Sequence, residues 1–485
     1  MLRAVLKGLV ARPFKRWLPS TDVQALRLRA RAAQARRDFA GAEADYRAAL
    51  ALKPDDPETA VEAAKLMYEL NRFEEALDFA AAAARVCPDA AAARHWQGLM
   101  LRELGRYEES EAVLGAAHAA HPASADISCA LALVLADAGR RGEAETLLRE
   151  VLAREPGHSI ARWQLAVLLL SLGRFREGWA SYEIRLLRSD VYVRPRALPI
   201  WDGTAPPEGP LLVLAEQALG DELLFASCFP DLLDRVGAVI IECDPRLGEL
   251  FARSFPRARI FAQRNPRAAA VTLPPGPVPA AQIAAGSLPA LFRADAHDFP
   301  QHCGYLVADP VRVSRWQDRL SALGSGAKIG LSWRGGTAKT RRALRSVPIP
   351  ALRPLLRRDD VHFVSLQYGH VDEELSVFAE LGDRVQHWPE ALNDYEETAA
   401  LVVALDLVIT VQTAVAHLAG ALGRPVWVMV PASPEWRYLA SGSSLPWYPT
   451  ARLFRQRRIA DWSEVISTVG SALDDQLMRG TPTVP

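Results

Sequence analysis

The sequence predicts an α-helical repeat array followed by an α/β body made of two Rossmann-like lobes. Three observations indicate this: a 34-residue period in the first part, a proline-rich junction (RPRALPIWDGTAPPEGP), and alternating strand and helix patterns after it. At 485 residues the chain is too long for one hydrophobic core, so two to three domains are expected. The expected segments are a basic N-terminal segment, the repeats, a linker, a first lobe and a second lobe, at 1–20, 21–190, 191–210, 211–310 and 311–478.

Four features recur every 34 residues in the first part. They are a proline (Pro54, Pro88, Pro122, Pro156), a turn residue (Asn71, Gly105, Gly139, Gly173), an aromatic residue (Phe39, Phe73, Tyr107, Phe175, interrupted at Arg141) and a small residue (Ala42, Ala76, Ser110, Ala144, Gly178). The pattern resembles the tetratricopeptide repeat, which has two antiparallel helices per unit. Five units fit between about Asp22 and Arg188. The small residue lets the helices approach closely, and glycine favours a left-handed turn between them.

The repeats and the composition bear on the expected partners. A stack of such units is a solenoid whose concave face binds peptides or proteins, with a rigid spacer or an oligomerisation surface as the alternative. The formal net charge of +0 gives no indication of nucleic-acid binding. The five cysteines lack CxxC spacing, which argues against a disulfide framework or a zinc site and suits the cytoplasm. No stretch approaches the roughly 20 apolar residues of a membrane span, although the basic N-terminal segment allows weak peripheral membrane contact.

Strand and helix patterns alternate twice after the junction. The first lobe is expected to contain strands at Leu211–Ala215, Ala238–Cys243 and Arg259–Phe261, with helices at Asp221–Leu233 and Pro245–Phe255. A looser, proline-rich stretch follows over Pro266–Pro310. The second lobe is expected to contain strands at Lys328–Trp333, His362–Gln367, Arg384–His387, Leu407–Thr410 and Val426–Val430, with helices at Ala351–Arg357, Asp372–Leu381, Asp394–Leu405, Thr413–Leu422 and Ser463–Leu477. Ligands of such lobes bind at the carboxyl ends of the strands.

The segment DLVITVQTAVAHLAGALGRPVWVMV carries the most functional information. It predicts a buried strand, a tight turn, a short helix with Thr413 as N-cap, and a second buried strand. A helix start at the carboxyl end of a parallel strand is suited to an anion, because the backbone N–H groups of Ala414, Val415 and Ala416 point outward. His417, one turn into the helix, can reach the same ligand. An ordinary βαβ unit with a core histidine is the alternative.

Two further turns are candidates for the same site. RGGTAKTRRALRS follows the strand Lys328–Trp333, and its Gly335 and Gly336 allow close backbone approach. Its cations would clamp a diphosphate, unless the turn is simply a solvated basic loop; they are Arg334, Lys339, Arg341, Arg342 and Arg345. Asp221 follows the first strand of the first lobe. It is either a carboxylate able to accept a proton from an acceptor hydroxyl or a plain N-terminal helix charge. There is no GxGxxG after a first strand, no GxxxxGK[ST], no HExxH and no GxSxG, so dinucleotide, P-loop, zincin and α/β-hydrolase chemistry are not indicated.

The motifs together resemble those of bacterial tetratricopeptide-repeat glycosyltransferases. The catalytic part is similar to the ADP-heptose:lipopolysaccharide heptosyltransferases and more distantly to O-linked N-acetylglucosamine transferase. The segments that carry this resemblance are WDG, EQALGDELLFAS, IGLSWRGG, RRALRSVP, VSLQYG, DLVITVQTAVAHLAGALGRPVWVMVP, PEWRYL and SLPWYPTARLFRQ. The resemblance implies a GT-B fold and an inverting mechanism without metal or cofactor. It makes Asp221 the base, and it places Arg334, Gln367 and the segment from Thr413 to His417 beside the nucleotide-sugar donor.

One position departs from that family. The family usually has an aspartate where this chain has Gln412, and in heptosyltransferases that aspartate contacts the donor sugar. Glutamine still forms hydrogen bonds but carries no charge, which fits either a different donor sugar or weakened activity. The expected function is sugar transfer, hexosyl, heptosyl or nonulosonyl, to a Ser or Thr hydroxyl of a protein such as flagellin or another surface protein. The alternatives are a scaffold with an inactive transferase domain, and a transferase that acts on a glycan or lipid.

Overall fold

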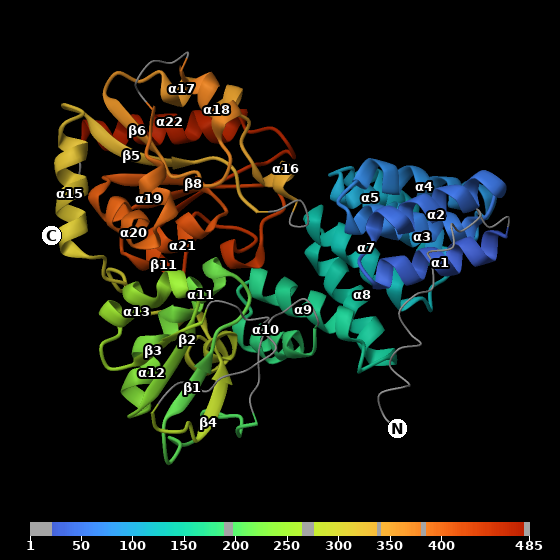
Figure 1. Ribbon diagram of the computed structural model, residues 1–485, viewed down its shortest axis with the longest axis horizontal. Coiled ribbons are helices and arrows are strands. Elements are labelled where there is room, and N and C mark those ends of the chain that lie inside the picture. The colour runs from blue at the N-terminus through green and yellow to red at the C-terminus, as the bar shows by residue number, and fades with distance from the viewer. Residues whose placement is uncertain (1–21, 189–196, 264–275, 337–340, 380–384, 480–485) are drawn as a thin grey trace, which may run out of the picture. The chain divides into compact units, whose positions relative to one another are not determined.

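The computed structural model describes residues 22–188, 197–263, 276–336, 341–379 and 385–479 (Figure 1). The chain forms two compact units, Met1–Leu135 and Ala136–Pro485. The expected N-terminal segment 1–20 and most of the first half of the linker lie outside the described residues. The expected cation Lys339 lies outside them as well. The described part contains no helix that is both long enough and apolar enough to cross a bilayer.

Between residues 22 and 182, all of which the structure describes, ten helices form five consecutive pairs, as the 34-residue period predicts. They are α1 Val23–Ala35, α2 Phe39–Leu52, α3 Pro57–Glu69, α4 Phe73–Val86, α5 Ala91–Glu103, α6 Tyr107–Ala120, α7 Ala125–Asp137, α8 Arg141–Arg154, α9 Ser159–Ser171 and α10 Phe175–Tyr182. Each of the four periodic prolines follows the second helix of a pair within two residues, where proline cannot continue the helix.

The turn within each pair is left-handed. The turn residues Asn71, Gly105, Gly139 and Gly173 have φ of 61°, 76°, 87° and 74°, and Arg37 adopts 62° at the same position of the first pair. The N–H after the turn returns to a carbonyl near the end of the first helix, as in Arg106 to Leu101 at 2.8 Å. This bond satisfies a helix-end carbonyl, so the recurring glycine has a direct conformational cause.

The small residues lie where paired helices touch. Ala42, Ala76, Ser110 and Ala144 are fully buried. Ser110 donates its hydroxyl to the Gly98 carbonyl of the neighbouring helix at 2.6 Å. A larger side chain at these positions would force the helices apart, which explains the period in small residues.

The first lobe is a parallel sheet in the order β3-β2-β1-β4. Its elements are β1 Leu211–Leu214, α11 Leu219–Phe225, α12 Phe229–Arg235, β2 Val239–Cys243, α13 Gly248–Ser254, β3 Arg259–Ala262, β4 Ala281–Ala284 and α14 Leu288–Phe292. Every residue of β1, β2 and β4 is buried, as expected for a sheet covered on both faces.

The second lobe, in its described residues, is a seven-stranded sheet in the order β10-β11-β9-β8-β5-β6-β7, parallel except for the pair β10–β11. Its strands are β5 Ala327–Ser332, β6 Val361–Ser365, β7 Val385–His387, β8 Leu407–Val411, β9 Val426–Val430, β10 Ser444–Leu445 and β11 Tyr448–Arg455. Its helices are α15 Pro310–Ser321, α16 Arg342–Arg345, α17 Ile349–Leu356, α18 Asp372–Ala379, α19 Pro389–Asn393, α20 Tyr395–Ala404, α21 Ala414–Ala421 and α22 Ser463–Met478. Helices α17, α18 and α22 cover one face, and α19, α20 and α21 lie on the other side in Figure 1.

The structure corrects the expected elements at three places. The proline-rich stretch after β3 contains a buried strand, β4, at the edge of the first-lobe sheet, and the end of this stretch begins helix α15. The expected helix Asp221–Leu233 is two helices, because a 3-10 turn at Ala226–Cys228 precedes Pro230 at the start of α12. The second sheet also extends to β10 and β11, which the sequence patterns did not indicate.

The last repeat helix packs directly into the α/β body. Trp179 of α10 is 1 % exposed and donates its indole N–H to the Arg293 carbonyl at 3.0 Å. Its ring also meets Trp436 and Trp447 of the second lobe edge to face, with centroids 5.5 and 6.1 Å apart. The repeat array therefore ends inside the hydrophobic core of the second compact unit.

Candidate functional site

The start of helix α21 has the predicted cap. Thr413 adopts extended backbone, and its hydroxyl accepts the Val415 N–H at 3.2 Å. The Thr413 carbonyl accepts the Ala416 N–H at 3.1 Å. The expectation that three amides point outward is therefore wrong for Val415 and Ala416, which have local acceptors. Ala414 is the amide at this helix start that remains a candidate for an anion.

The turn after β5 lies against the turn after β8. A Cβ added at Gly335 would stand 2.7 Å from both the Gln412 carbonyl oxygen and the Thr413 methyl carbon. Real Cβ atoms essentially never approach another heavy atom so closely, so this approach requires glycine. The prediction that glycine permits close backbone approach in this turn is confirmed at Gly335.

Gln412 is 1 % exposed and lies at the centre of these contacts. Its carbonyl accepts from Arg345 at 2.8 Å, and its Oε1 accepts the Glu435 N–H at 3.4 Å. Its Nε2 is buried and has no hydrogen-bond partner among the described residues. A buried amide without an acceptor costs free energy, and such groups call for an explanation.

Asp221 reaches this region from the first lobe. Its carboxylate caps its own helix by accepting the Ala218 N–H at 3.2 Å and also pairs with Arg437 of the second lobe. Asp221 is therefore a helix-start charge, as one interpretation of the sequence has it, and its carboxylate also faces the second lobe. Burial raises the pKa of the Asp221 carboxyl above its usual range, and the Arg437 guanidinium opposes that rise.

The starts of α11 and α21 are in close contact beside this ion pair. A Cβ added at Gly220 would lie 3.2 Å from the His417 ring and 3.6 Å from the Ala414 Cα. The two lobes therefore meet at Asp221 on one side and the Thr413 turn on the other. The N-terminal ends of α11 and α21 therefore lie side by side.

His417 has a structural environment. It is 5 % exposed, its Nδ1 lies 3.0 Å from the Tyr448 hydroxyl, and its Nε2 lies 3.3 Å from the Tyr438 hydroxyl. Burial, aided by the charge of Arg437, lowers the pKa of His417 to about 3, so the ring is neutral at ordinary pH. The alternative of a core histidine describes this residue better than the expectation of a ligand contact.

Two described cations of the basic turn, Arg334 and Arg341, contact protein groups. Arg334 pairs with Glu374 at 3.1 Å and donates to the His370 carbonyl at 2.9 Å. Arg341 adopts a left-handed φ of 55° and pairs with Asp137 at 2.8 Å. These two side chains are thus directed to acidic protein partners in this structure.

Gln367 shapes the turn after β5. Its Oε1 accepts the Arg334 N–H at 2.9 Å, the Trp333 N–H at 3.2 Å and the Ser332 hydroxyl at 3.2 Å. Because these bonds use the amide oxygen inside the fold, Gln367 holds the turn in place rather than pointing away from it. Gln367 would therefore act on a ligand only by fixing the shape of the turn after β5.

Three charged residues complete the site: Arg345, one of the cations expected from the basic turn, and Glu435 and Arg437, which sequence reasoning did not assign. Arg345 bridges the Gln412 carbonyl and Glu435, the latter at 2.6 Å, and Glu435 lies 3.4 Å from Arg437. Burial alone would raise the pKa of Glu435, but the Arg345 and Arg437 guanidinium groups hold it below its usual range. The available signal for Glu435 and Arg437 was the pair of opposite charges in PEWRYL, set beside the aromatic residues Trp436 and Tyr438.

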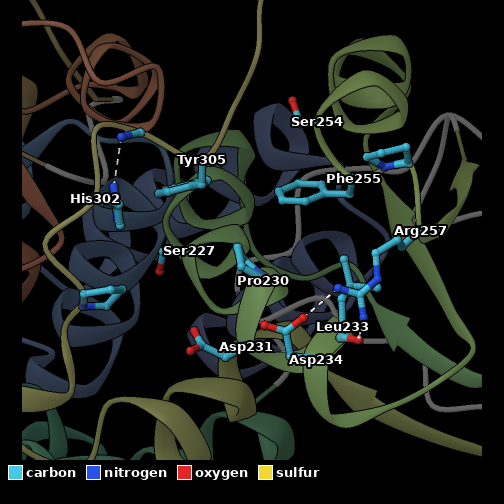
Figure 2. Close-up of a pocket in the computed structure, with 13 residues that line it drawn as sticks. Ser227, Pro230, Asp231, Leu233, Asp234, Ser254, Phe255, Arg257, His302 and Tyr305 are labelled. Atoms are coloured by element: carbon cyan, nitrogen blue, oxygen red, sulfur yellow. Dashed lines mark hydrogen bonds and ion pairs between the residues drawn. The ribbon is translucent and has the colours of Figure 1, made fainter.

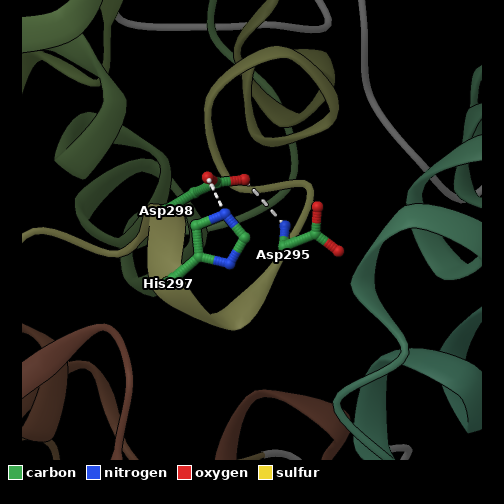
Figure 3. A group of neighbouring side chains, drawn as sticks. All are labelled: Asp295, His297 and Asp298. Carbon is green, nitrogen blue, oxygen red and sulfur yellow. Dashed lines mark hydrogen bonds and ion pairs between the residues drawn. The ribbon is translucent and has the colours of Figure 1, made fainter.

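Two other features of the described residues lie away from these turns. The first lobe contains a cavity of about 490 Å³. Figure 2 shows side chains that line it, among them Ser227, Asp231, Phe255, His302 and Tyr305. Figure 3 shows a group of acidic and histidine side chains, Asp295, His297 and Asp298. There Asp298 accepts the Asp295 N–H at 2.8 Å, and Asp295 pairs with Arg176. These bonds account for the arrangement as a helix cap and a surface ion pair.

Comparison with known proteins identifies the repeats. Tetratricopeptide-repeat family models match residues 61–125 and 135–178. The N-terminal region is therefore a tetratricopeptide-repeat solenoid, and such repeats imply protein partners. Protein FlbA of Caulobacter vibrioides is 32% identical over 317 residues, which cover 62% of this chain and 53% of that protein. The chain thus spans about half the length of this curated relative.

Three solved structures match part of the chain. A thermophilic tetratricopeptide-repeat protein of Thermus thermophilus is 25% identical with a TM-score of 0.32, covering 35% of this chain and 92% of that one. YrrB, a repeat protein with an unusual peptide-binding site, is 19% identical with a TM-score of 0.27, covering 34% and 84%. PilW, a type IV pilus biogenesis factor, is 23% identical with a TM-score of 0.32, covering 34% and 78%.

Proposed function

We propose that this chain is a glycosyltransferase that moves a sugar from a nucleotide-sugar donor to a protein hydroxyl. The observation that carries the proposal is the meeting of three turns. The turn after β5 touches the turn after β8 at Gly335 and Gln412, and Asp221 of the first lobe reaches the same region. Ligands of α/β sheets bind at the carboxyl ends of strands, and a two-lobed enzyme of the GT-B type uses both lobes in this way.

In this proposal the donor phosphate lies at the turn that begins α21. The Ala414 N–H and the helix dipole favour an anion there, and Arg345 and Arg437 add positive charge within the same network. Lys339 of the adjacent basic turn is a further expected contact and lies outside the described residues. Fixed donors of this kind are each worth about 3–4 kcal/mol when they meet charge that develops in the transition state.

The reaction is a single displacement with inversion. The acceptor hydroxyl oxygen forms a bond to the anomeric carbon while the bond from that carbon to the phosphate oxygen breaks. The electron pair leaves with the phosphate, and the hydroxyl proton passes to the Asp221 carboxylate. Asp221 suits this role because burial raises the pKa of its carboxyl toward the working pH of a general base.

The acceptor is proposed to be a protein recruited by the repeats. Tetratricopeptide arrays bind peptides and proteins, and the last repeat helix here is joined to the α/β body through Trp179. A partner held by the repeats would therefore be tethered to the proposed site, because the repeats are continuous in the chain with the α/β body and pack into it through Trp179. Such a tether raises the effective concentration of the acceptor hydroxyl.

Direct binding and transfer measurements test the proposal. Titration calorimetry of the full chain with sugars activated by UDP, GDP, ADP or CMP should reveal one class that binds. Co-expression with a candidate surface protein, followed by intact-mass measurement, should show one added sugar mass. Asp221→Asn should abolish that addition, and exposed Asp234→Asn of the same lobe should not. Absence of binding by every donor class, or full turnover by Asp221→Asn, would contradict the proposal.

A protein-binding scaffold is the second candidate, and a specific observation favours it. Arg334, Arg341 and Asp221 are each paired with a protein group of opposite charge, as in a site that has lost its ligand. A scaffold would keep its partner but show no heat of binding with any donor. The same calorimetric titration therefore separates the two candidates. A transferase directed to a glycan or lipid would bind a donor but leave the mass of the protein partner unchanged.

A further inference from the structure

Arg437 holds the proposed base in an ion pair across the two lobes. It belongs to a short 3-10 helix, η7 Trp436–Tyr438, and its guanidinium contacts the Asp221 carboxylate. The two side chains are 13 % and 12 % exposed, so water screens the pair only partly. The guanidinium makes the buried Asp221 carboxylate a weaker proton acceptor than it would be without the pair, because protonation would leave the cation without its partner.

The groups around Arg437 limit where its guanidinium can go. The Glu435 carboxylate lies 3.4 Å from Nη1, the Gln217 Oε1 lies 3.4 Å from Nη2, and the Trp436 ring centroid lies 4.7 Å from the guanidinium carbon. Glu435 is also tied to Arg345, which donates to the Gln412 carbonyl. The chain of contacts from Asp221 to the turn after β8 is therefore continuous and charged.

The same guanidinium is suited to a phosphate. Arginine presents planar donors that match carboxylate and phosphate oxygens in the same two-pronged geometry. Asp221 lies next to Gly220, which is in contact distance of Ala414 at the proposed phosphate position. A phosphate at that position and the Asp221 carboxylate would therefore compete for one cation.

We infer that Arg437 is a catalytic residue that exchanges partners, pairing with Asp221 when the donor is absent and with the donor phosphate when it is bound. The exchange frees the Asp221 carboxylate to accept the proton of the acceptor hydroxyl only when a donor is in place. It also supplies positive charge to the departing phosphate. This inference rests on the proposed function. It identifies Arg437 as the residue that couples the donor-phosphate position to the proposed base, Asp221.

If Asp221 and the donor phosphate compete for Arg437, removing the Asp221 charge should strengthen donor binding. Asp221→Asn removes the competing charge but keeps the shape of the side chain, so Arg437 becomes available to the phosphate. The variant should lose transfer and yet bind the donor about tenfold more tightly than the natural chain. Arg437→Gln should bind the donor about tenfold more weakly. In the double variant the gain from Asp221→Asn should disappear, because no guanidinium remains to be released.

The test is titration calorimetry with the nucleotide sugar that the natural chain binds. Arg358→Gln serves as the matched control, because Arg358 pairs with Asp360 and Asp474 elsewhere in the second lobe, and its donor affinity should be unchanged. Arg437→Lys keeps the charge without the planar fork and should retain part of the affinity. If Arg437→Gln fails to fold, the donor affinity of Asp221→Asn, compared with that of the natural chain, still tests the exchange.

Failure of the proposed function and failure of the partner exchange at Arg437 give different results in these titrations. If the natural chain binds no nucleotide sugar, the proposed function fails, and the exchange fails with it. If the natural chain binds and transfers but Asp221→Asn binds no more tightly, the exchange alone is overturned. Equal gains from Asp221→Asn with and without Arg437 would also overturn it, because the gain would then have another source.

Discussion

Arg185 and Glu216 form a fully buried, two-pronged ion pair that joins the end of the repeats to the first lobe. Arg185 donates from Nε and Nη2 to the two oxygens of Glu216 at 2.8 and 2.9 Å, and neither side chain is exposed. Arg185 follows α10 in the 3-10 helix η1 Glu183–Leu187, and Glu216 follows β1 in the turn that leads to Asp221. The repeat array and the proposed base are thus linked through one charged contact.

Replacing Arg185 by Met should strongly destabilise the second compact unit. The change leaves the Glu216 carboxylate buried without its cation, which typically costs about 3–5 kcal/mol. The expected result is a lower denaturant midpoint for that unit in urea unfolding followed by tryptophan fluorescence. Arg257→Met is the matched control, since Arg257 pairs with Asp234 at an exposed site and should change stability by less than about 1 kcal/mol. Equal effects of the two variants would contradict the importance of the buried pair.

Gly335→Ala should disturb the contact between the turns after β5 and β8. The new Cβ would stand 2.7 Å from the Gln412 carbonyl oxygen, so one of the two turns has to move. We expect a loss of about 1–3 kcal/mol in unfolding free energy and weaker donor binding, measured by thermal unfolding and calorimetry. Gly470→Ala in α22 has open space around its Cβ and should be neutral or slightly stabilising. Unchanged donor affinity in Gly335→Ala would count against a ligand at these turns.

Glu222 should make stability depend on pH. Burial raises the pKa of its carboxyl from 4.5 to about 8, against the opposing hydrogen bond from the Asp244 N–H. Between these two values the folded chain holds a proton that the unfolded chain has lost, so stability falls as pH rises. Glu222→Gln keeps an acceptor for Asp244 and removes this dependence.

The measurement for Glu222 is a pair of urea unfolding series from about pH 5 to about pH 9, which spans the range of the expected titration. The stability of the variant should be close to that of the natural chain near pH 5 and should exceed it increasingly up to about pH 8, by about 3–4 kcal/mol. Glu249→Gln, an exposed carboxylate on α13, is the control for loss of a negative charge in the same lobe. A constant difference between Glu222→Gln and the natural chain across this range would rule out the proposed titration.

Arg37→Gly should stabilise the first repeat. Arg37 occupies with φ of 62° the turn position that is glycine in three of the other repeats, and a left-handed conformation costs a side chain about 1 kcal/mol. The gain should be a fraction of that cost, because glycine also increases the entropy of the unfolded chain. Arg36→Gly is the control, since Arg36 has φ of −86° and gains nothing from glycine. In thermal unfolding, the melting temperature of Arg37→Gly should be higher than that of the natural chain, and the melting temperature of Arg36→Gly should be lower.

The helical repeats and most of the strands were predictable because their causes are local. A 34-residue period in four residue types encodes the helix pairs and the left-handed turns, and runs of buried β-branched residues encode strands such as β8 and β9. The cap at Thr413 followed from the same local logic. Strand β4 was missed because its four residues, AQIA, carry little β-branched signal and follow a proline-rich stretch.

The partners of the charged residues were not predictable, because each partner lies far away in the sequence. Arg437 and Asp221 are separated by 216 positions, and Arg341 and Asp137 by 204. Sequence patterns assigned Arg334 and Arg341 to a ligand, whereas in the structure they pair with acidic protein groups. His417 was expected to reach a ligand and instead lies between two tyrosine hydroxyls.

The sequence by itself determined the repeat period, the alternation of strands and helices, and the places where short turns follow buried strands. These features depend on backbone preferences and on the burial of neighbouring residues, which act over a few positions. Only the tertiary structure decided which turns meet, which carboxylate faces which guanidinium, and which polar atoms remain without a partner. The physical reason is that charge pairing and close backbone approach depend on distances between segments, and packing of the whole chain sets those distances.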